Sequence, residues 1–226
     1  MEIPLGDKKI SLNGKVILIQ GDYSKVFPLA ISLLRISGDC ALLFLDDFNT
    51  RVFLSEVGYV SRDELSKIMV SKFENLIQLD KALEQSEKIL LNRKSFKILL
   101  IGSLPNAYLR EISLHDASSH SNILYLLNKI LAFFSFLSKE YDCTGILISP
   151  SRSLDYGENA PDIPAKRIFL YWVDYLLELR KCSRDMFAGR LKTRSGDEVY
   201  VCLPMGNIKE LGEIRICKRD ECQRSV

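Results

Sequence analysis

Residues 21–28 lie where a nucleotide-binding protein would keep a loop that holds phosphate groups. The pattern of such a loop is Gly-x-x-x-x-Gly-Lys-Ser/Thr, placed between a strand and a helix. An apolar run at residues 16–19 precedes Gly21, and a helical pattern follows it. The stretch itself reads Gly21, Asp22, Tyr23, Ser24, Lys25, Val26, Phe27 and Pro28. Its place and its first glycine fit, so the later positions decide what it can bind.

Those later positions carry the wrong chemistry. Counting from Gly21, Val26 stands at the second glycine, Phe27 at the lysine and Pro28 at the hydroxyl position. A valine Cβ hinders close approach of the backbone, and a phenylalanine supplies no cation for the phosphates. A proline offers neither a hydroxyl for magnesium nor an amide N–H. We therefore expect a degenerate phosphate loop that binds no nucleotide cofactor.

A nucleotide site also needs a carboxylate at the end of a core strand, where it holds magnesium through water. The candidate strand, residues 97–101, ends in Gly102, Ser103 and Leu104. Gly102 thus stands in the place of the acid. Phosphoryl transfer depends on a lysine, a metal and a positioned water. We expect a pseudo-ATPase with no catalytic residues, although the stretch after Gly21 is also compatible with an ordinary strand–helix turn.

Basic residues are the candidates for contacting nucleic acid. The formal net charge is only +2, which excludes a polyanion binder that uses its whole surface. Arg190, Lys192 and Arg194 alternate, so a strand places them on one face, where they can follow a phosphate backbone. A charged edge strand that resists aggregation has the same pattern. The candidates are Arg110, Arg152, Lys166, Arg167, Arg190, Lys192 and Arg194.

Histidine and cysteine give weaker signals. His115 and His120 flank Asp116, but their spacing matches no closed zinc pattern, and we expect no metal. Six cysteines are sparse at this length and indicate a reducing compartment, so we expect a cytoplasmic protein, or a nuclear one in a eukaryote. The late cysteines could form a zinc site or a disulfide, although unpaired thiols are the simpler interpretation. They are Cys182, Cys202, Cys217 and Cys222.

Hydrophobic patterning predicts the elements that position these residues. Apolar runs without alternation are typical of strands buried on both faces of a parallel sheet. They occupy residues 16–19, 41–45, 98–101 and 145–148. Helical patterns lie between them at residues 28–37, 62–92 and 121–141, and an interruption of the second near Leu79 and Asp80 stays open. The last is apolar enough to predict a helix packed on the sheet. We expect an α/β fold, with helices on both faces of a mostly parallel sheet.

The pattern changes after the last of these runs. Residues 150–164 are rich in Ser, Asp, Pro and Gly and predict a long functional or mobile loop. Strand-like segments follow at 186–194, 198–203 and 208–218, with a turn at Ser195, Gly196 and Asp197. We expect them to close one edge of the sheet as antiparallel strands. No linker or repeat divides the chain, so we expect a single domain over residues 1–226.

In order along the chain, these segments resemble the ATPase core of the RecA/RadA recombinase superfamily. The resemblance is to its short archaeal RadB-like paralogs, which lack the N-terminal helical domain. Residues 12–21 resemble the entry into the phosphate-loop strand (Walker A), and residues 97–104 resemble the Walker B strand with Gly102 in place of the aspartate. Residues 145–152 and 168–202 resemble the strand before the second DNA-facing loop and the closing segment. The place of the family's water-positioning glutamate, near Phe48, is vacant.

The resemblance implies a RecA-like subunit that works through its surfaces. Without a phosphate loop it can dock on an active neighbour but not hydrolyse ATP. The expected function is to bind a recombinase or another paralog, with or without single-stranded DNA, and to modulate homologous recombination and DNA repair. One alternative resembles the RecA-like subunits of the Elongator accessory ring, which bind tRNA. Another is an atypical NTPase that uses Lys25 with Asp46 or Asp47. We expect Tyr23 and Phe27 to fill the former nucleotide volume.

Overall fold

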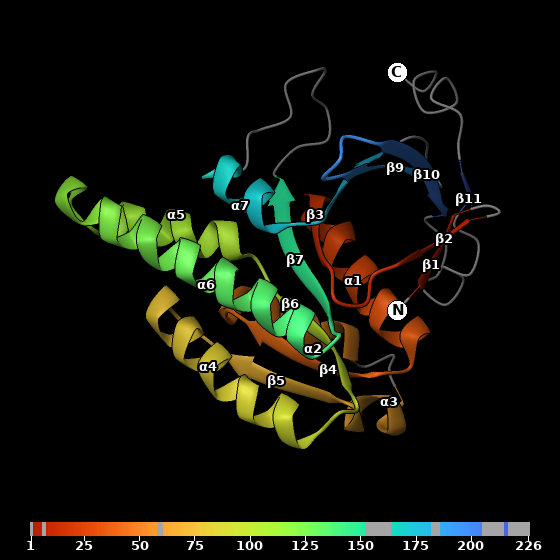
Figure 1. Ribbon diagram of the computed structural model, residues 1–226, viewed down its shortest axis with the longest axis horizontal. Helices are drawn as coiled ribbons and strands as arrows, with labels where there is room; N and C mark the ends of the chain where they lie inside the picture. The colour runs from red at the N-terminus through yellow and green to blue at the C-terminus, as the bar shows by residue number, and fades with distance from the viewer. Residues whose placement is uncertain are drawn as a thin grey trace.

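One nine-stranded sheet runs through the molecule (Figure 1). The computed structural model describes residues 2–5, 8–57, 61–151, 164–181, 186–204 and 215–216. The strands of the sheet are β3 (Val16–Asp22), β4 (Cys40–Leu45), β5 (Ile68–Lys72), β6 (Phe96–Ile101), β7 (Thr144–Ser151), β8 (Tyr175–Lys181), β9 (Met186–Thr193), β10 (Glu198–Pro204) and β11 (Arg215–Ile216). A separate hairpin pairs β1 (Glu2–Leu5) with β2 (Lys8–Ser11).

The strand order is β11-β10-β9-β8-β3-β7-β6-β4-β5. From β8 to β5 all neighbours are parallel, whereas β9, β10 and β11 are antiparallel additions at one edge. The predicted apolar runs lie in β3, β4, β6 and β7, and each is buried on both faces, as expected for central parallel strands. The predicted fold class is therefore confirmed as an α/β fold with a mostly parallel sheet and an antiparallel edge.

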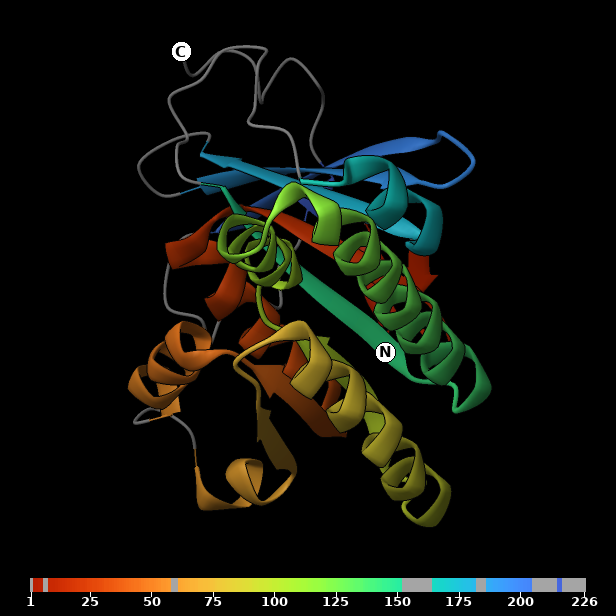
Figure 2. The same ribbon diagram turned by 90° about the vertical axis from the view of Figure 1, so that its left-hand side faces the viewer.

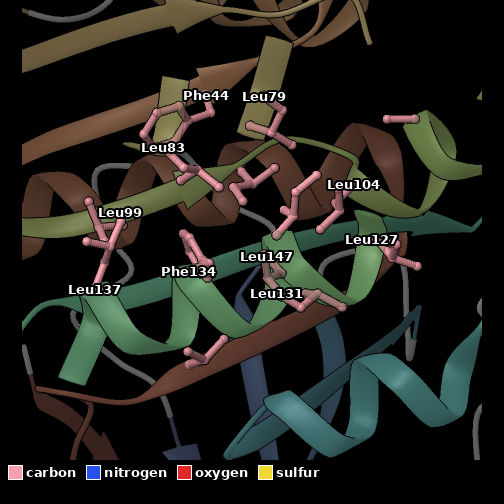
Figure 3. Packing of buried hydrophobic residues seen from close by; sticks show 14 of the residues in the cluster. Phe44, Leu79, Leu83, Leu99, Leu104, Leu127, Leu131, Phe134, Leu137 and Leu147 are labelled. Carbon is pink, nitrogen blue, oxygen red and sulfur yellow. The ribbon is translucent and has the colours of Figure 1, made fainter. Parts of the chain in front are cut away.

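Helices cover both faces of the sheet (Figure 2). α1 (Tyr23–Ser37) and α2 (Asp47–Val57) pack on one face. The other face carries α4 (Leu76–Asn92), α5 (Leu104–Leu114), α6 (His120–Glu140) and α7 (Lys166–Trp172). Figure 3 shows this second core, in which Phe134 and Leu131 of α6 lie with Leu99 and Leu147 of the sheet. The short α3 (Arg62–Ser66) precedes β5, and a 3-10 turn at Ala117–Ser119 joins α5 to α6.

α6 is the helix that the sequence predicts to lie on the sheet. With the preceding turn, it is the one helix in the described ranges that is long and apolar enough to cross a membrane. Its inward residues nevertheless pack in the core, where Leu127, Ile130 and Phe134 are 0% exposed. The prediction of a sheet-packed helix is confirmed.

The helical pattern of residues 62–92 is interrupted by β5, and not near Leu79 and Asp80, which lie within α4. A capping box between Ser61 and Glu64 begins α3, β5 follows, and Asn75 caps the start of α4. A strand interrupts the helical pattern because Ile68 and Val70 are β-branched and pair with β4. The turn predicted at 195–197 is present, and Gly196 has a φ of 95°. Most of the predicted loop 150–164 and of segment 208–218 lies outside the described residues.

Candidate functional site

The carboxyl ends of the parallel strands meet at one edge of the sheet, where α/β proteins bind ligands. The favoured places are switch points, at which neighbouring strands lead to helices on opposite faces. β3 leads to α1 while its neighbour β7 leads to α7 on the other face. β4 and β6 differ in the same way, since they lead to α2 and α5. Gly21 and Gly102 end up at these two switch points.

At the first switch point, no loop separates strand from helix. β3 ends at Asp22 and α1 begins at Tyr23. Gly21 is a strand residue in register with Pro150, and the segment from Tyr23 to Pro28 is helical. A phosphate loop holds its ligand with successive backbone N–H groups of a loop between the strand and the helix, together with those of the first turn of the helix. The predicted loop at residues 21–28 is therefore wrong as an element, because β3 and α1 take up all of its residues.

The former loop positions contribute to the hydrophobic core instead. Val26 and Phe27 are both 0% exposed and pack between α1 and the sheet. A Cβ at Gly21 would lie 2.9 Å from the Cβ of Leu179 and 3.2 Å from a methyl group of Val26. Glycine at this position thus permits close packing of β3. The prediction that Tyr23 fills the nucleotide volume falls outside the described side chains.

At the second switch point, Gly102 packs against Asn49 of α2. A Cβ at Gly102 would lie 2.9 Å from Asn49 Cγ and 3.0 Å from Leu45 Cδ2. Asn49 is 0% exposed and donates to Asp46 Oδ1 twice, from its side chain at 2.7 Å and from its backbone at 2.8 Å. Asp46 thereby caps α2. No space is left beside Gly102 for the carboxylate side chain that would hold magnesium.

Sequence analysis did not find Asn49. The available signal was its position, three residues after an aspartate at the start of a helix, which is the spacing of a helix cap. The sequence likewise offered no indication that Ser103 is buried in an unusual backbone conformation. It has a φ of 61° and is 1% exposed, and its Oγ has no hydrogen-bond partner in the described part of the chain. The segment after β6 is therefore buried and conformationally strained.

The second carboxylate considered for an atypical NTPase, Asp47, is already paired. Lys72 Nζ lies 2.5 Å from Asp47 Oδ1. This hydrogen bond is the main cause that lowers the pKa of Asp47, with further contributions from Arg51 and Arg110. Arg110 donates to the backbone oxygen of Glu74. Arg110, one of the predicted nucleic-acid contacts, thus lies near the end of β5 at the carboxyl edge.

The alternating cations of β9 are neutralised by carboxylates. Arg190 Nε donates to Glu178 Oε2 at 2.7 Å, and Lys192 Nζ lies 3.7 Å from both Glu178 and Glu198. Glu178 and Glu198 are opposite Arg190 and Lys192 in the strand register. The edge-strand interpretation is wrong, because β9 is paired on both sides. The interpretation that this strand follows a phosphate backbone is weakened, because Arg190 and Lys192 already have carboxylate partners.

The remaining predicted nucleic-acid contacts lie elsewhere in the fold. Lys166 and Arg167 begin α7, and Arg194 follows β9 in the turn to β10. The guanidinium carbon of Arg194 lies 5.5 Å from the ring centre of Tyr171. Arg152 falls outside the described residues. The candidates are therefore divided among the carboxyl edge, the antiparallel strands and the neighbourhood of α7.

The two histidines make local contacts at the end of α5. His115 Nδ1 lies 2.8 Å from the backbone oxygen of Glu111. His120 Nε2 lies 3.2 Å from the backbone oxygens of Ile112 and His115. Within the described ranges no group of three or more His, Cys, Asp or Glu side chains could hold a metal ion. These histidines act as caps for the helix end.

Cys202, near the C-terminal end of the chain, differs from the expectation that the cysteines of this region are unpaired thiols. Cys202 on β10 is disulfide-bonded, whereas Cys40 and Cys143 are free. Burial raises the pKa of the Cys143 thiol to about 11. Cys182, Cys217 and Cys222 lie outside the described residues. For Cys202 the disulfide alternative replaces the expectation of a free thiol.

Two comparisons of the sequence with known proteins give no relative. No family model matches the sequence. A search among curated proteins also finds no similar chain.

Proposed function

We propose that this protein is a non-hydrolysing RecA-like subunit that docks on a recombinase or another paralog and modulates homologous recombination. The observation that carries the proposal is the direct junction of β3 and α1, with Val26 and Phe27 buried in the core. The strand order and the helices on both faces are compatible with a RecA-like core. Such a subunit keeps the architecture of a nucleotide-binding protein but has no place for the phosphates.

The packing at the second switch point supports the same proposal. Asn49 fills the space beside Gly102 and uses its amide to bond Asp46. Asp47 is bound to Lys72. Both carboxylates of the atypical NTPase alternative therefore already have partners within the protein, which counts against this alternative.

The edge strand β5 is the surface that we assign to the protein partner. Among the described strands, β5 pairs with β4 alone. The backbone oxygen of Lys67 accepts a hydrogen bond from Ala41, and the backbone N–H of Phe73 donates to Leu45. Alternate residues of a strand direct their backbone groups to the same side, so the odd-numbered residues of β5 face β4. The N–H of Val70 therefore points away from β4. Val70 is 39% and Met69 is 36% exposed. An edge of this kind can add an extended segment of a partner as a further strand.

Charge at the end of β5 indicates what such a segment carries. Lys72 at the strand end, Arg51 and Arg110 all lie within electrostatic reach of Asp47, and Glu74 is a second carboxylate that acts on Lys72. Three cations against these two carboxylates favour an extended segment with acidic residues at one end. We therefore propose that β5 pairs with a strand of the recombinase that is apolar and carries acidic residues at one end.

A pull-down with the recombinase of the same organism, purified, tests this function. We expect the wild-type protein to retain the recombinase, and the Val70→Pro variant to bind it at least about tenfold more weakly, since one outward N–H and the strand geometry are lost. Val70→Ala is the matched control, because it keeps the N–H and should bind within about threefold of the wild type. Thermal unfolding of both variants verifies the fold.

Two results would contradict the proposal. One is a wild-type protein that retains no recombinase at micromolar concentration, and the other is equal binding by Val70→Pro. Recovery of tRNA-bound RecA-like subunits from the native source would instead favour the Elongator-like alternative.

A further inference from the structure

We infer that the outward face of α6 binds a second copy of this chain, with the two α6 helices antiparallel. This inference goes beyond the proposed docking through β5 and does not depend on it. α6 runs across the front of Figure 1, between α4 and α7. An apolar stretch of 18 residues within 117–140 is only 44% buried in the protein. A helix of this composition is normally covered on most sides, so the outer face of α6 calls for a partner.

The outer face of α6 carries a regular stripe of four residues. Tyr125, Lys129, Ala132 and Phe136 follow one another at intervals of four, three and four residues. This is the spacing of the seam along which two helices pack in a coiled coil. The side chain of Tyr125 is 72% exposed and that of Phe136 is 45% exposed, whereas Ala132 between them is half-buried. The stripe therefore projects a ring at each end of a low centre.

The charge of Lys129 does not oppose this packing. Lys129 Nζ donates to Asp80 Oδ2 at 2.6 Å and to Glu84 Oε1 at 3.0 Å, and both carboxylates belong to α4. The ammonium group is thereby drawn toward α4, while the aliphatic part of the side chain stays on the stripe. The excess negative charge of this cluster lies on α4, beside the stripe. Two copies can therefore bring their stripes together without placing unpaired ammonium groups against each other.

The stripe is symmetric about its middle, which favours a second copy over an unrelated partner. Positions 125 and 136 are equally far from the midpoint between 130 and 131, and so are positions 129 and 132. In an antiparallel pair, Tyr125 therefore faces Phe136 of the second copy, and Ala132 leaves room for the stem of Lys129. Aromatic pairs stabilise such contacts. A two-fold interface uses the same surface on both copies, as this stripe allows.

The area of the stripe fits a weak dimer. At the exposures given above, the four rings of a pair bury roughly 450 Å² between the two copies. A standard protein–protein interface buries about 1,600 Å². Side chains beside the rings on α4 and α7 add to the area, but the total stays at the low end of specific interfaces. We therefore expect a dissociation constant on the order of 10–100 µM.

Sedimentation velocity of the full chain between about 1 and 300 µM measures this association. We expect monomers at the low end of this range and dimers at the high end. Phe136→Lys and Ala132→Glu should each weaken the dimer at least about tenfold, because each places a charge in the seam. Leu54→Lys is the matched control, since Leu54 is 62% exposed on α2, on the other face of the sheet, and this variant should dimerise as the wild type does. Thermal unfolding verifies the fold of each variant.

Cysteine cross-linking tests the antiparallel arrangement. A mixture of Tyr125→Cys and Phe136→Cys should form disulfide-linked dimers on oxidation with diamide, because the two positions face each other. Either variant alone should form few. Position 125 of one copy lies about 16 Å along the helix axis from position 125 of the other, beyond the reach of a disulfide. The wild type measures the background that the native cysteines produce.

Several results would overturn the inference. The first is a wild-type protein that stays monomeric up to about 300 µM. The second is a Phe136→Lys variant that associates as strongly as the wild type. Cross-linking of Tyr125→Cys alone, as readily as in the mixture, would contradict the antiparallel pair. Flotation of a monomeric wild type with phosphatidylcholine vesicles would assign this face of α6 to a membrane instead.

Discussion

Replacing Phe27 by lysine, which restores the cation of a phosphate loop in sequence, is expected to lower the free energy of unfolding by about 4 kcal/mol or more. Phe27 is 0% exposed in the core between α1 and the sheet. The variant loses the packing of an aromatic side chain and forces an ammonium group into apolar surroundings. Urea denaturation of wild type and variant measures the difference, and the variant should still bind no ATP.

Phe136→Lys is the matched control for this experiment. Phe136 lies on α6 and is 45% exposed, so a lysine there keeps its charge in water. We expect its unfolding free energy to stay within about 1 kcal/mol of the wild type. Equal stability of Phe27→Lys and wild type, or a gain of ATP binding in Phe27→Lys, would show that position 27 faces an open site.

Replacing Gly102 by aspartate, which restores the acid of the second motif, is expected to cost about 3 kcal/mol of stability without producing ATPase activity. A Cβ at this position lies 2.9 Å from Asn49 Cγ and 3.0 Å from Leu45 Cδ2, so α2 must move. The new carboxylate would also be buried beside Asp46, which is 7% exposed. Urea denaturation and a phosphate-release assay measure the two effects.

A double-mutant cycle isolates the clash that causes this loss. Gly102→Ala adds the Cβ alone and should cost about 1–3 kcal/mol. Asn49→Ala removes the atoms that the Cβ meets, at the cost of the hydrogen bond to Asp46. If the two residues pack as described, the double variant is more stable than the sum of the single losses by at least about 0.5 kcal/mol. Strict additivity would contradict the packing.

The central strands could be predicted from the sequence because a strand that is buried on both faces is apolar at successive positions. Residues 16–19 or 98–101 are apolar without interruption, and only a central parallel strand or a buried helix has that composition. β5 could not be found in this way. It lies at the edge, and its apolar run at residues 68–70 is shorter than those of the central strands and includes the exposed Met69 and Val70. A short half-exposed strand beside a helical pattern is therefore easily assigned to the helix.

The site was harder to predict than the fold because its decisive features combine distant segments. The pattern of residues 21–28 shows which side chains are missing, but it does not show that α1 starts at Tyr23 and removes the loop. Asn49 meets Gly102 only because β4 and β6 are neighbours in the sheet. Arg190 and Glu178 likewise become partners through strand register. Charge alternation along one strand carries no information about the strand beside it.

The central claim is that this protein binds no nucleotide. Isothermal titration calorimetry of the wild-type protein with ATP and magnesium tests it most directly. The β3–α1 junction leaves no loop for phosphates, and Asn49 fills the place of the metal-holding acid. We predict no saturable heat and no rise in melting temperature up to about 1 mM nucleotide, since a ligand that binds only the folded state must stabilise it. Saturable binding with a dissociation constant in the micromolar range, abolished by Lys25→Ala, would contradict the account.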